Sequence, residues 1–199
     1  MAESYNFTFR PNPDFHSLPL ANRIRIIGGQ WRGRRLHFPA DQGVRPTPDR
    51  VRETLFNWLG QDLTGASTLE LFGGSGALSL EALSRGAALA VTVDRNPLLV
   101  SAIIAAGAAL GTDRLEARCA DAYAFFTHER RLFDVIFLDP PFGKARWPEL
   151  LGRGAARLAP DGAVYVEARE PIIVPPNLAI VRRHKAGQVH YHLLRRAPA

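Results

Sequence analysis

Short apolar segments typical of β-strands alternate with segments typical of α-helices between residues 68 and 168. The predicted strands are residues 68–72, 88–93, 115–119, 134–138 and 163–168, and the predicted helices between them are residues 76–84, 97–110, 122–128 and 147–158. Strands that are joined through helices pair in parallel, and the helices cover both faces of the sheet. The chain is therefore predicted to have an α/β fold with a parallel sheet.

The segment before this alternation predicts a separate hairpin. Residues 24–26 and 36–38 alternate apolar with polar or basic side chains, and glycines lie between them. A helix is predicted to follow, with Thr47 as its N-cap and Pro48 as its first residue.

The C-terminal end also departs from the alternation. Residues 180–184 and 189–195 flank a short glycine-containing turn, which predicts an antiparallel hairpin. We therefore divide the chain into three parts: a mobile tail over residues 1–20, a basic hairpin extension over residues 21–46, and an α/β domain over residues 47–199.

Composition excludes several classes of protein. One cysteine, Cys119, excludes a disulfide framework and a cysteine-based zinc site. His190 and His192 have no evident carboxylate partner, so we expect no metal site. The N-terminus lacks the apolar centre of a signal peptide, and the longest uncharged run, residues 96–112, is shorter than the roughly 20 residues of a membrane span. We expect a soluble, cytoplasmic monomer.

The formal charge of +6 is unevenly distributed. Residues 20–52 hold eight Arg and two acids, residues 180–199 hold five Lys or Arg and no acid, and residues 53–179 have a net charge of −4. Basic clusters with an interleaved aromatic residue, here Trp31, are typical of nucleic-acid binding. The alternatives are a charged hairpin edge that prevents aggregation, and a bias toward arginine across the sequence. The candidate RNA contacts in the hairpin are Arg25, Arg32, Arg34 and Arg35.

A glycine-rich turn follows the first strand of the alternation. Gly74 and Gly76 let the backbone turn tightly and approach a ligand closely. Ser79 stands where a dinucleotide-binding motif requires Gly or Ala, so that motif is incomplete. Glu70 beside the turn suits a cationic sulfonium better than a pyrophosphate. The turn therefore favours S-adenosylmethionine over NAD.

Acidic residues follow the next two strands as well. Asp94 can accept both hydroxyl groups of a ribose, and Asp121 with Ala122 can line an adenine. Because ligands of parallel sheets bind at the carboxyl ends of the strands, these residues predict an adenosine site. The alternative is that the acids only cap helices or turns. The predicted cofactor contacts are Glu70, Phe72, Gly73, Gly74, Ser75, Gly76, Asp94, Asp121, Ala122 and Asp139.

The fourth strand ends in a rigid turn, Asp139-Pro140-Pro141-Phe142. The exocyclic amine of a base is a poor nucleophile, because its lone pair is delocalised into the ring. The Asp139 side chain and the Pro140 carbonyl could accept its two hydrogens and direct the lone pair at a methyl group. Phe142 could stack on the extruded base. The turn is therefore the candidate catalytic site, with the alternative that it only terminates a strand.

Three further cations are candidates for RNA contacts. Lys144 and Arg146 follow the catalytic turn and could meet phosphates, or could simply be exposed to solvent. Arg45 could contact the substrate or orient the cofactor loop, or could form an ion pair with an acid such as Glu53.

Together these motifs resemble the class I amino-methyltransferases. Residues 45–59 (RPTPDRVRETLFNWL) and residues 25–36 (RIIGGQWRGRRL) narrow the resemblance to the RsmD family, over about residues 23–196. Glu70 stands where that family commonly has Asp, and Gly73 where it commonly has Ala.

This resemblance implies a Rossmann-like domain with a seven-stranded, mostly parallel sheet whose last strand is antiparallel. It also implies S-adenosylmethionine as cofactor and methyl transfer to the 2-amino group of one guanine in bacterial 16S ribosomal RNA. The substrate would be the small ribosomal subunit or an assembly intermediate of it. Two alternatives stay open: a DNA adenine amino-methyltransferase, which shares the catalytic turn, and a non-catalytic RNA-binding assembly factor.

Overall fold

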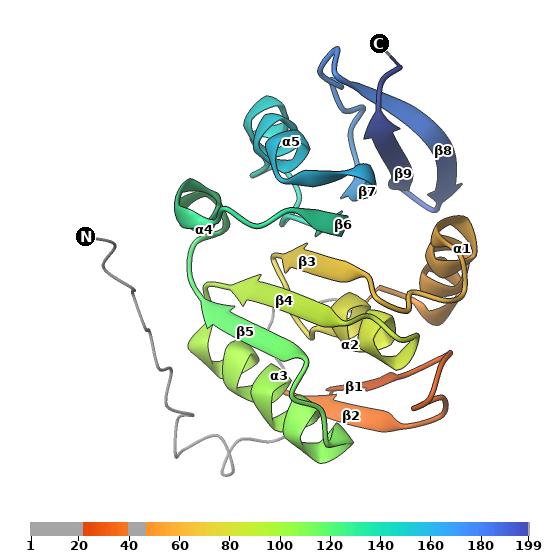
Figure 1. The fold of residues 1–199 in the computed structure, drawn as a ribbon, viewed down its shortest axis with the longest axis vertical. Coiled ribbons are helices and arrows are strands. Elements are labelled where there is room, and N and C mark those ends of the chain that lie inside the picture. Colours follow the sequence, from red (N-terminus) through yellow and green to blue (C-terminus); the bar gives the residue numbers. More distant parts are fainter. Residues whose placement is uncertain (1–21, 40–46, 199) are drawn as a thin grey trace.

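The computed structural model describes residues 22–39 and 47–198, in which helices lie on both faces of a central sheet (Figure 1). The helices are α1 (Asp49–Leu59), α2 (Ala77–Ser84), α3 (Pro97–Leu110), α4 (Ala122–His128) and α5 (Trp147–Ala156). The strands are β1 (Asn22–Arg25), β2 (Arg35–Phe38), β3 (Ser67–Leu71), β4 (Leu89–Asp94), β5 (Leu115–Cys119), β6 (Phe133–Leu138), β7 (Leu158–Ala168), β8 (Leu178–Ala186) and β9 (Val189–Arg196).

The seven-stranded sheet has the strand order β5-β4-β3-β6-β7-β9-β8. Strands β3 to β7 pair in parallel, and β9 is antiparallel to both β7 and β8. The last strand of the chain is thus inserted between its two predecessors. The predicted fold, a mostly parallel α/β sheet with an antiparallel last strand and an N-terminal hairpin, is confirmed.

Apolar side chains of the seven-stranded sheet face two separate cores, and those of the hairpin belong to a third with α2 and α3. On β4, Val91 and Val93 belong to the core beneath α4 and α5, whereas Ala90 belongs to the core beneath α1 and α2. This alternation follows from the period of two of a strand, and it explains why nearly every residue of the central strands is apolar. Within the described ranges, no helix has the length and apolarity that a bilayer span requires.

The hairpin of β1 and β2 docks on the C-terminal end of α2. The Gln30 backbone N–H donates to the Ser84 carbonyl over 2.7 Å, and the Ser84 hydroxyl donates to the Gly28 carbonyl over 2.6 Å. Gly29 has a φ of +72°, and a Cβ there would lie 1.8 Å from the Ser84 carbonyl oxygen. Only glycine fits this approach, so the glycines of the hairpin loop hold it on the helix.

A buried carboxylate, Glu81 of α2, joins the hairpin to two helices. It lies 3.3 Å from Arg52 of α1 and 2.9 Å from Arg85, and it accepts a hydrogen bond from the Ile27 backbone N–H. Arg52 is itself buried and donates to the Arg25 carbonyl over 2.7 Å. Buried charges are stable only when they are paired and hydrogen-bonded, so this cluster fixes how α1, α2 and the hairpin sit together.

Helix α1 begins differently from its prediction. The structure places its N-cap at Pro48, without a side-chain capping bond, and the helix starts at Asp49. The Thr47 hydroxyl instead donates to Glu167 at the end of β7, 120 positions along the chain. The prediction of Thr47 as N-cap was therefore wrong, because a distant carboxylate is the partner of its hydroxyl.

Some of the predictions concern parts of the chain that the structure does not describe. The tail over residues 1–20 lies outside the described residues, and so does Arg45. The division at residues 20 and 46 stays a prediction.

Glu81→Gln tests the buried cluster. The neutral side chain leaves Arg52 and Arg85 in the interior without their carboxylate, so we expect the free energy of unfolding to fall by about 3–5 kcal/mol. Urea unfolding measures this change, with the exposed Glu53→Gln on α1 as the matched control. Equal stability of the two variants would show that Glu81 does not hold the hairpin and helices together.

Candidate active site

The parallel register brings acidic residues of neighbouring strands together at the carboxyl ends of the strands, which we call the carboxyl edge of the sheet. Leu71 pairs with Val93 on one side and with Leu138 on the other, so the residues that follow these three strands lie in one row. Asp94 ends β4, and Asp139 follows β6 directly. The predicted cofactor residues and the predicted catalytic turn therefore meet at the same edge.

The glycine-rich turn after β3 has the tight backbone that its sequence predicts. Gly74 and Gly76 have φ values of +53° and +71°, and Phe72, at +62°, is the one non-glycine residue with positive φ among the described residues. A Cβ at Gly73 would lie 2.4 Å from the Thr92 side chain. Such backbone strain is typical of functional sites. At Gly73 the turn therefore lies so close to β4 that there is no room for a side chain.

Glu70 is buried and accepts a hydrogen bond of 2.9 Å from the Ser79 backbone N–H in the first turn of α2. Burial raises its pKa to about 7, and the negative charge of Asp94 adds to the shift. Glu70 thus holds the glycine turn to the helix that follows it.

Asp94 and Asp121 also orient loops. The carboxylate of Asp94 accepts from the backbone N–H groups of Gly74 and Asn96, each over 2.8 Å. Asp121 is the N-cap of α4 and accepts from the backbone N–H groups of Tyr123 and Ala124 over 3.0 Å. The alternative interpretation, that these acids cap helices or turns, is therefore correct for part of their hydrogen bonding. Each oxygen of Asp94 keeps a second lone pair, and Oδ2 of Asp121 accepts neither capping bond, so capping leaves acceptors for a ligand.

The other predicted cofactor residues surround this turn. Ser75 and Ala122 are buried, and the ring of Phe72 packs edge-on against Tyr123 with 6.3 Å between the ring centroids. The glycine turn and the start of α4 thereby come together, as an adenosine site requires.

The predicted catalytic turn presents one acid and one aromatic ring. Asp139 is partly buried and Pro140 is buried, whereas Pro141 and Phe142 are exposed. Burial, then the negative charges of Glu167 and Glu70, raise the pKa of Asp139 well above its ordinary value. The guanidinium carbon of Arg169 lies 4.1 Å from the centroid of the Phe142 ring. The turn thus places a perturbed carboxyl group beside an exposed aromatic face.

Sequence reasoning missed Glu167, the neighbour of Asp139. Leu138 pairs with Val166, so Glu167 on β7 lies beside Asp139 at the edge. Glu167 is buried and accepts from the Tyr165 hydroxyl over 3.0 Å and from Thr47 over 3.1 Å. Burial raises its pKa to about 7. The available signal was one acid near the carboxyl end of an otherwise apolar strand.

The predicted RNA contacts fall into two groups. Lys144 and Arg146 are exposed between β6 and α5, and Arg146 lies over the Tyr123 ring, with 4.1 Å between its guanidinium carbon and the ring centroid. In the hairpin, Arg32, Arg34 and Arg35 are exposed. The structure does not bring these two groups into one cluster, and their roles stay predictions.

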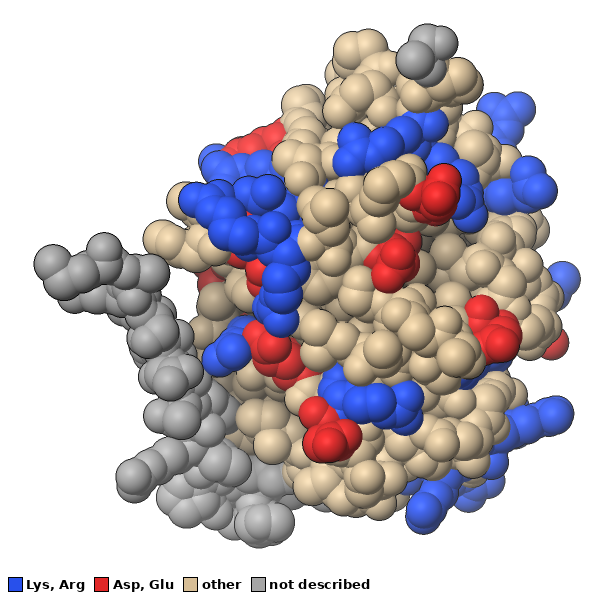
Figure 2. Space-filling model, viewed as in Figure 1, with Lys and Arg blue, Asp and Glu red and all other residues tan. Residues whose placement is uncertain are grey.

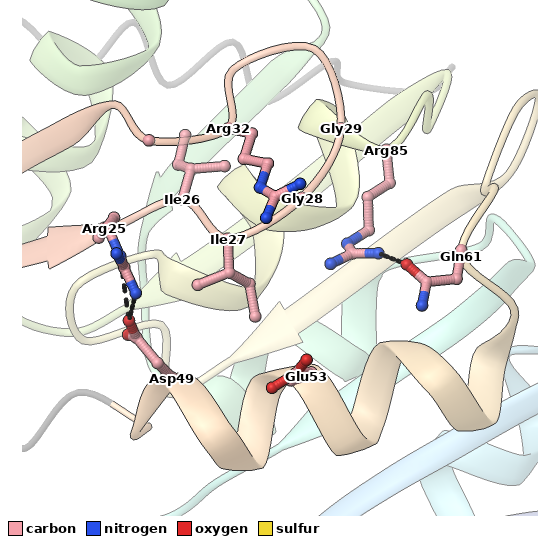
Figure 3. A pocket seen from close by; sticks show the side chains of 11 residues that line it. Arg25, Ile26, Ile27, Gly28, Gly29, Arg32, Asp49, Glu53, Gln61 and Arg85 are labelled. Carbon is pink, nitrogen blue, oxygen red and sulfur yellow. Dashed lines mark hydrogen bonds and ion pairs between the residues drawn. The ribbon is translucent and has the colours of Figure 1, made fainter.

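A pocket of about 590 Å³ lies between the hairpin loop and α1 (Figure 3). Arg25, at its rim, is held by Asp49 over 2.9 Å, and Arg85 donates to Gln61 over 2.8 Å. Two of the pocket's cations therefore already have partners in the protein, whereas the exposed Arg32 side chain forms no ion pair with any residue that the structure describes.

Comparisons relate this chain to proteins that are already known. The family model described as Conserved hypothetical protein 95 matches residues 24–195. Ribosomal RNA small subunit methyltransferase D of Escherichia coli is 40% identical over 181 residues, which cover 88% of this chain and 91% of that protein.

Two solved structures share the fold. The Escherichia coli protein yhhF has a TM-score of 0.81 at 41% identity, covering 88% of this chain and 98% of the other. SMU.776, solved in complex with SAH, has a TM-score of 0.69 over 88% of this chain and 56% of its own. Its identity of 16% supports the fold alone.

Glu167→Gln tests the crowding of acids at this edge. In the folded protein Glu167 holds its proton up to about pH 7, whereas in the unfolded chain it loses it near 4.5. The folded state binds more protons between these values, so this group makes the free energy of unfolding fall as the pH rises. Gln does not titrate, so we expect the variant to gain on the order of 1–3 kcal/mol relative to the wild type between pH 5 and pH 8.

Urea unfolding at constant ionic strength measures this difference, with the exposed Glu170→Gln as control. A difference between Glu167→Gln and the wild type that stays constant with pH would contradict the assignment.

Proposed function

This chain belongs to the family described as Conserved hypothetical protein 95, the RsmD family, and from that premise we propose that it methylates the 2-amino group of a guanine in 16S ribosomal RNA. S-adenosylmethionine is the proposed methyl donor. The observation that carries the proposal is the Asp139-Pro140-Pro141-Phe142 turn, which lies in one row with a strained glycine turn and its acids. The reaction would take place in the cytoplasm, where ribosomal subunits are found.

The residues at the sheet edge fit this cofactor. A ligand with an adenosine and a cationic centre needs acceptors for its ribose, a flat cover for its base and negative charge near its sulfur. Asp94 supplies the acceptors, and Asp121 and Ala122 lie where the base would bind. The close approach of Gly73 to Thr92 keeps the glycine turn tight against β4, beside Asp94. When bound, the cofactor supplies an electrophilic methyl group.

The carboxyl cluster gives this site its charge preference. The charge of Asp94 adds to the raised pKa of Glu70, and the charges of Glu167 and Glu70 add to the raised pKa of Asp139, so these carboxyl groups lie within electrostatic reach along the edge. A cation bound among them favours their ionised forms. A pyrophosphate would add to the repulsion instead, so the cluster favours a sulfonium over a dinucleotide.

Asp139 and Pro140 orient the guanine amine. An ionised Asp139 side chain and the Pro140 carbonyl each accept one amine hydrogen, so the nitrogen lone pair turns toward the methyl group. Rigid acceptors of this kind lower the barrier by positioning and by electrostatic preorganisation. The nitrogen loses its proton after methyl transfer and needs no strong base, and Asp139, with its raised pKa, can receive that proton.

Phe142 provides the surface for the base. Its ring is 40% exposed, and the Arg169 guanidinium covers one side of it. The pair offers an aromatic face and a cation, which suits a guanine lifted from its RNA stack.

The RNA partner follows from the same family relationship and from the basic hairpin. The protein would act as a monomer on the small ribosomal subunit or on an assembly intermediate of it. DNA adenine methylation is the alternative that the catalytic turn itself allows, and duplex DNA belongs in the assay as a competing substrate.

Asp139→Ala tests the proposal. The variant loses one of the two acceptors for the amine hydrogens, so we expect kcat for methyl transfer to small ribosomal subunits to fall by about 100-fold or more. The dissociation constant of S-adenosylmethionine, measured by calorimetry, should change far less than kcat, because Glu70, Asp94 and Asp121 remain in place for the cofactor. Transfer of tritiated methyl groups to subunits from a strain that lacks the modification measures the rate.

Asp161→Ala is the matched control, because Asp161 is exposed near the start of β7, away from the row of acids. Unchanged turnover in Asp139→Ala would overturn the catalytic role. Methylation of duplex DNA in preference to subunits would replace the proposed substrate.

A further inference from the structure

Strand β8 is the outermost strand on one side of the sheet. Its C-terminal end lies at the same carboxyl edge as the catalytic turn. Because β9 is antiparallel to both of its neighbours, β8 runs in the same direction as β7. Glu167 pairs with Tyr191 of β9, and Tyr191 pairs with His184 of β8. The row that begins at Asp139 therefore continues outward, strand by strand, to the end of β8.

The basic residues of this C-terminal segment separate into two groups. Arg195 and Arg196 lie at the opposite edge, where they pair with the start of β8. Arg195 donates to the Asp161 carbonyl over 2.6 Å, and Arg196 to the Leu158 carbonyl over 2.6 Å. These two guanidinium groups thus stabilise the fold.

The second group lies toward the catalytic edge and has no such anchoring. Arg182, Arg183 and Lys185 are exposed, and none forms an ion pair with an acid within the described parts of the chain. Arg182 donates only to the carbonyl of its neighbour Val181. In the view of Figure 2, Lys and Arg side chains gather on the rim where Figure 1 places β8. We call Arg182, Arg183 and Lys185 the β8 strip.

The strip suits a phosphate backbone better than a folded acidic surface. Successive side chains of a strand point to opposite faces, so Arg183 and Lys185 share one face, about 7 Å apart, while Arg182 lies on the other. No acid lies within residues 180–199 to neutralise them. A row of unpaired cations along a free edge can follow a polyanion and release its counterions.

The charge of the remaining edge supports the same orientation. The strands on the cofactor side end in Glu70, Asp94 and Asp121, which repel phosphate. An RNA that delivers its guanine to Asp139 is thus repelled on one side of the turn and attracted on the other. The acids and the strip together determine from which side the backbone approaches.

We propose that Arg182, Arg183 and Lys185 bind the phosphate backbone of the RNA substrate beside the catalytic turn, as a contact separate from the N-terminal hairpin. This inference rests on the proposed function, because it concerns the substrate of the same site.

The test compares the full-length triple variant Arg182→Gln/Arg183→Gln/Lys185→Gln with the wild type. The probes are unmodified small ribosomal subunits and protein-free 16S RNA, each titrated at several salt concentrations. Three lost phosphate contacts should lower the slope of log affinity against log salt by about 2–3. The KM for subunits should rise about 10-fold or more, with kcat within about twofold and S-adenosylmethionine affinity unchanged.

Single variants give a matched control. Arg183→Gln should reduce the salt slope by about one, whereas Arg130→Gln should not. Arg130 is equally exposed but lies just before β6, at the opposite edge of the sheet.

Each outcome decides a separate question. If the slope and KM of the triple variant are unchanged and the wild type is active, the β8 strip does not bind the RNA, and the proposed function stands. A higher KM for subunits without a change of slope on either probe would assign the strip to a ribosomal protein instead of RNA. A wild type that binds RNA but transfers no methyl group would contradict the proposed function.

Discussion

The parallel pairing of β3, β4, β6 and β7 in one register is the constraint on which the site depends. It aligns the ends of these strands and brings together the buried Glu70 and Glu167 and the partly buried Asp94 and Asp139. Burial raises the pKa of Glu70, Asp139 and Glu167, and repulsion from neighbouring acids adds to the shift at Glu70 and Asp139, which costs stability at neutral pH. Backbone N–H groups offset part of that cost, and a bound cation offsets more. The crowding that destabilises the empty protein is therefore what attracts a sulfonium, and ligand binding should stabilise the fold.

The reversed direction of β9 gives the edge its second property. Because β9 returns between β7 and β8, the end of β8 reaches the catalytic edge, and its start lies at the other. Cations near the end of β8 can therefore face a substrate, while Arg195 and Arg196 bind backbone carbonyls. The net charge of +6 thus conceals a directional arrangement, with acids along the cofactor half of the edge and cations beyond β7.

Local signals made most of the fold predictable. Helix α3 has its predicted bounds because Asn96 caps it, Pro97 opens it and Gly111 ends it with a left-handed backbone. The signals that failed were those with distant partners. Thr47 precedes Pro48 as an N-cap would, but its hydroxyl binds Glu167 instead. Glu81 and Arg52 carry no local signal of their pairing, because only the packing of α1 on α2 makes them a buried pair. Sequence alone does not determine such long-range pairings.

Helix α2 links the two halves of the proposed activity. At its first turn the Ser79 backbone binds Glu70 and so holds the glycine turn, and at its last turn Ser84 binds the hairpin loop. All eight of its residues are buried. A short helix that is packed on every side cannot tilt without breaking contacts at both ends, because protein interiors are close-packed. The hairpin therefore keeps a fixed distance from the cofactor turn. A fixed distance favours an RNA whose target base and docking surface are themselves held in place, as they are in a folded ribosomal subunit.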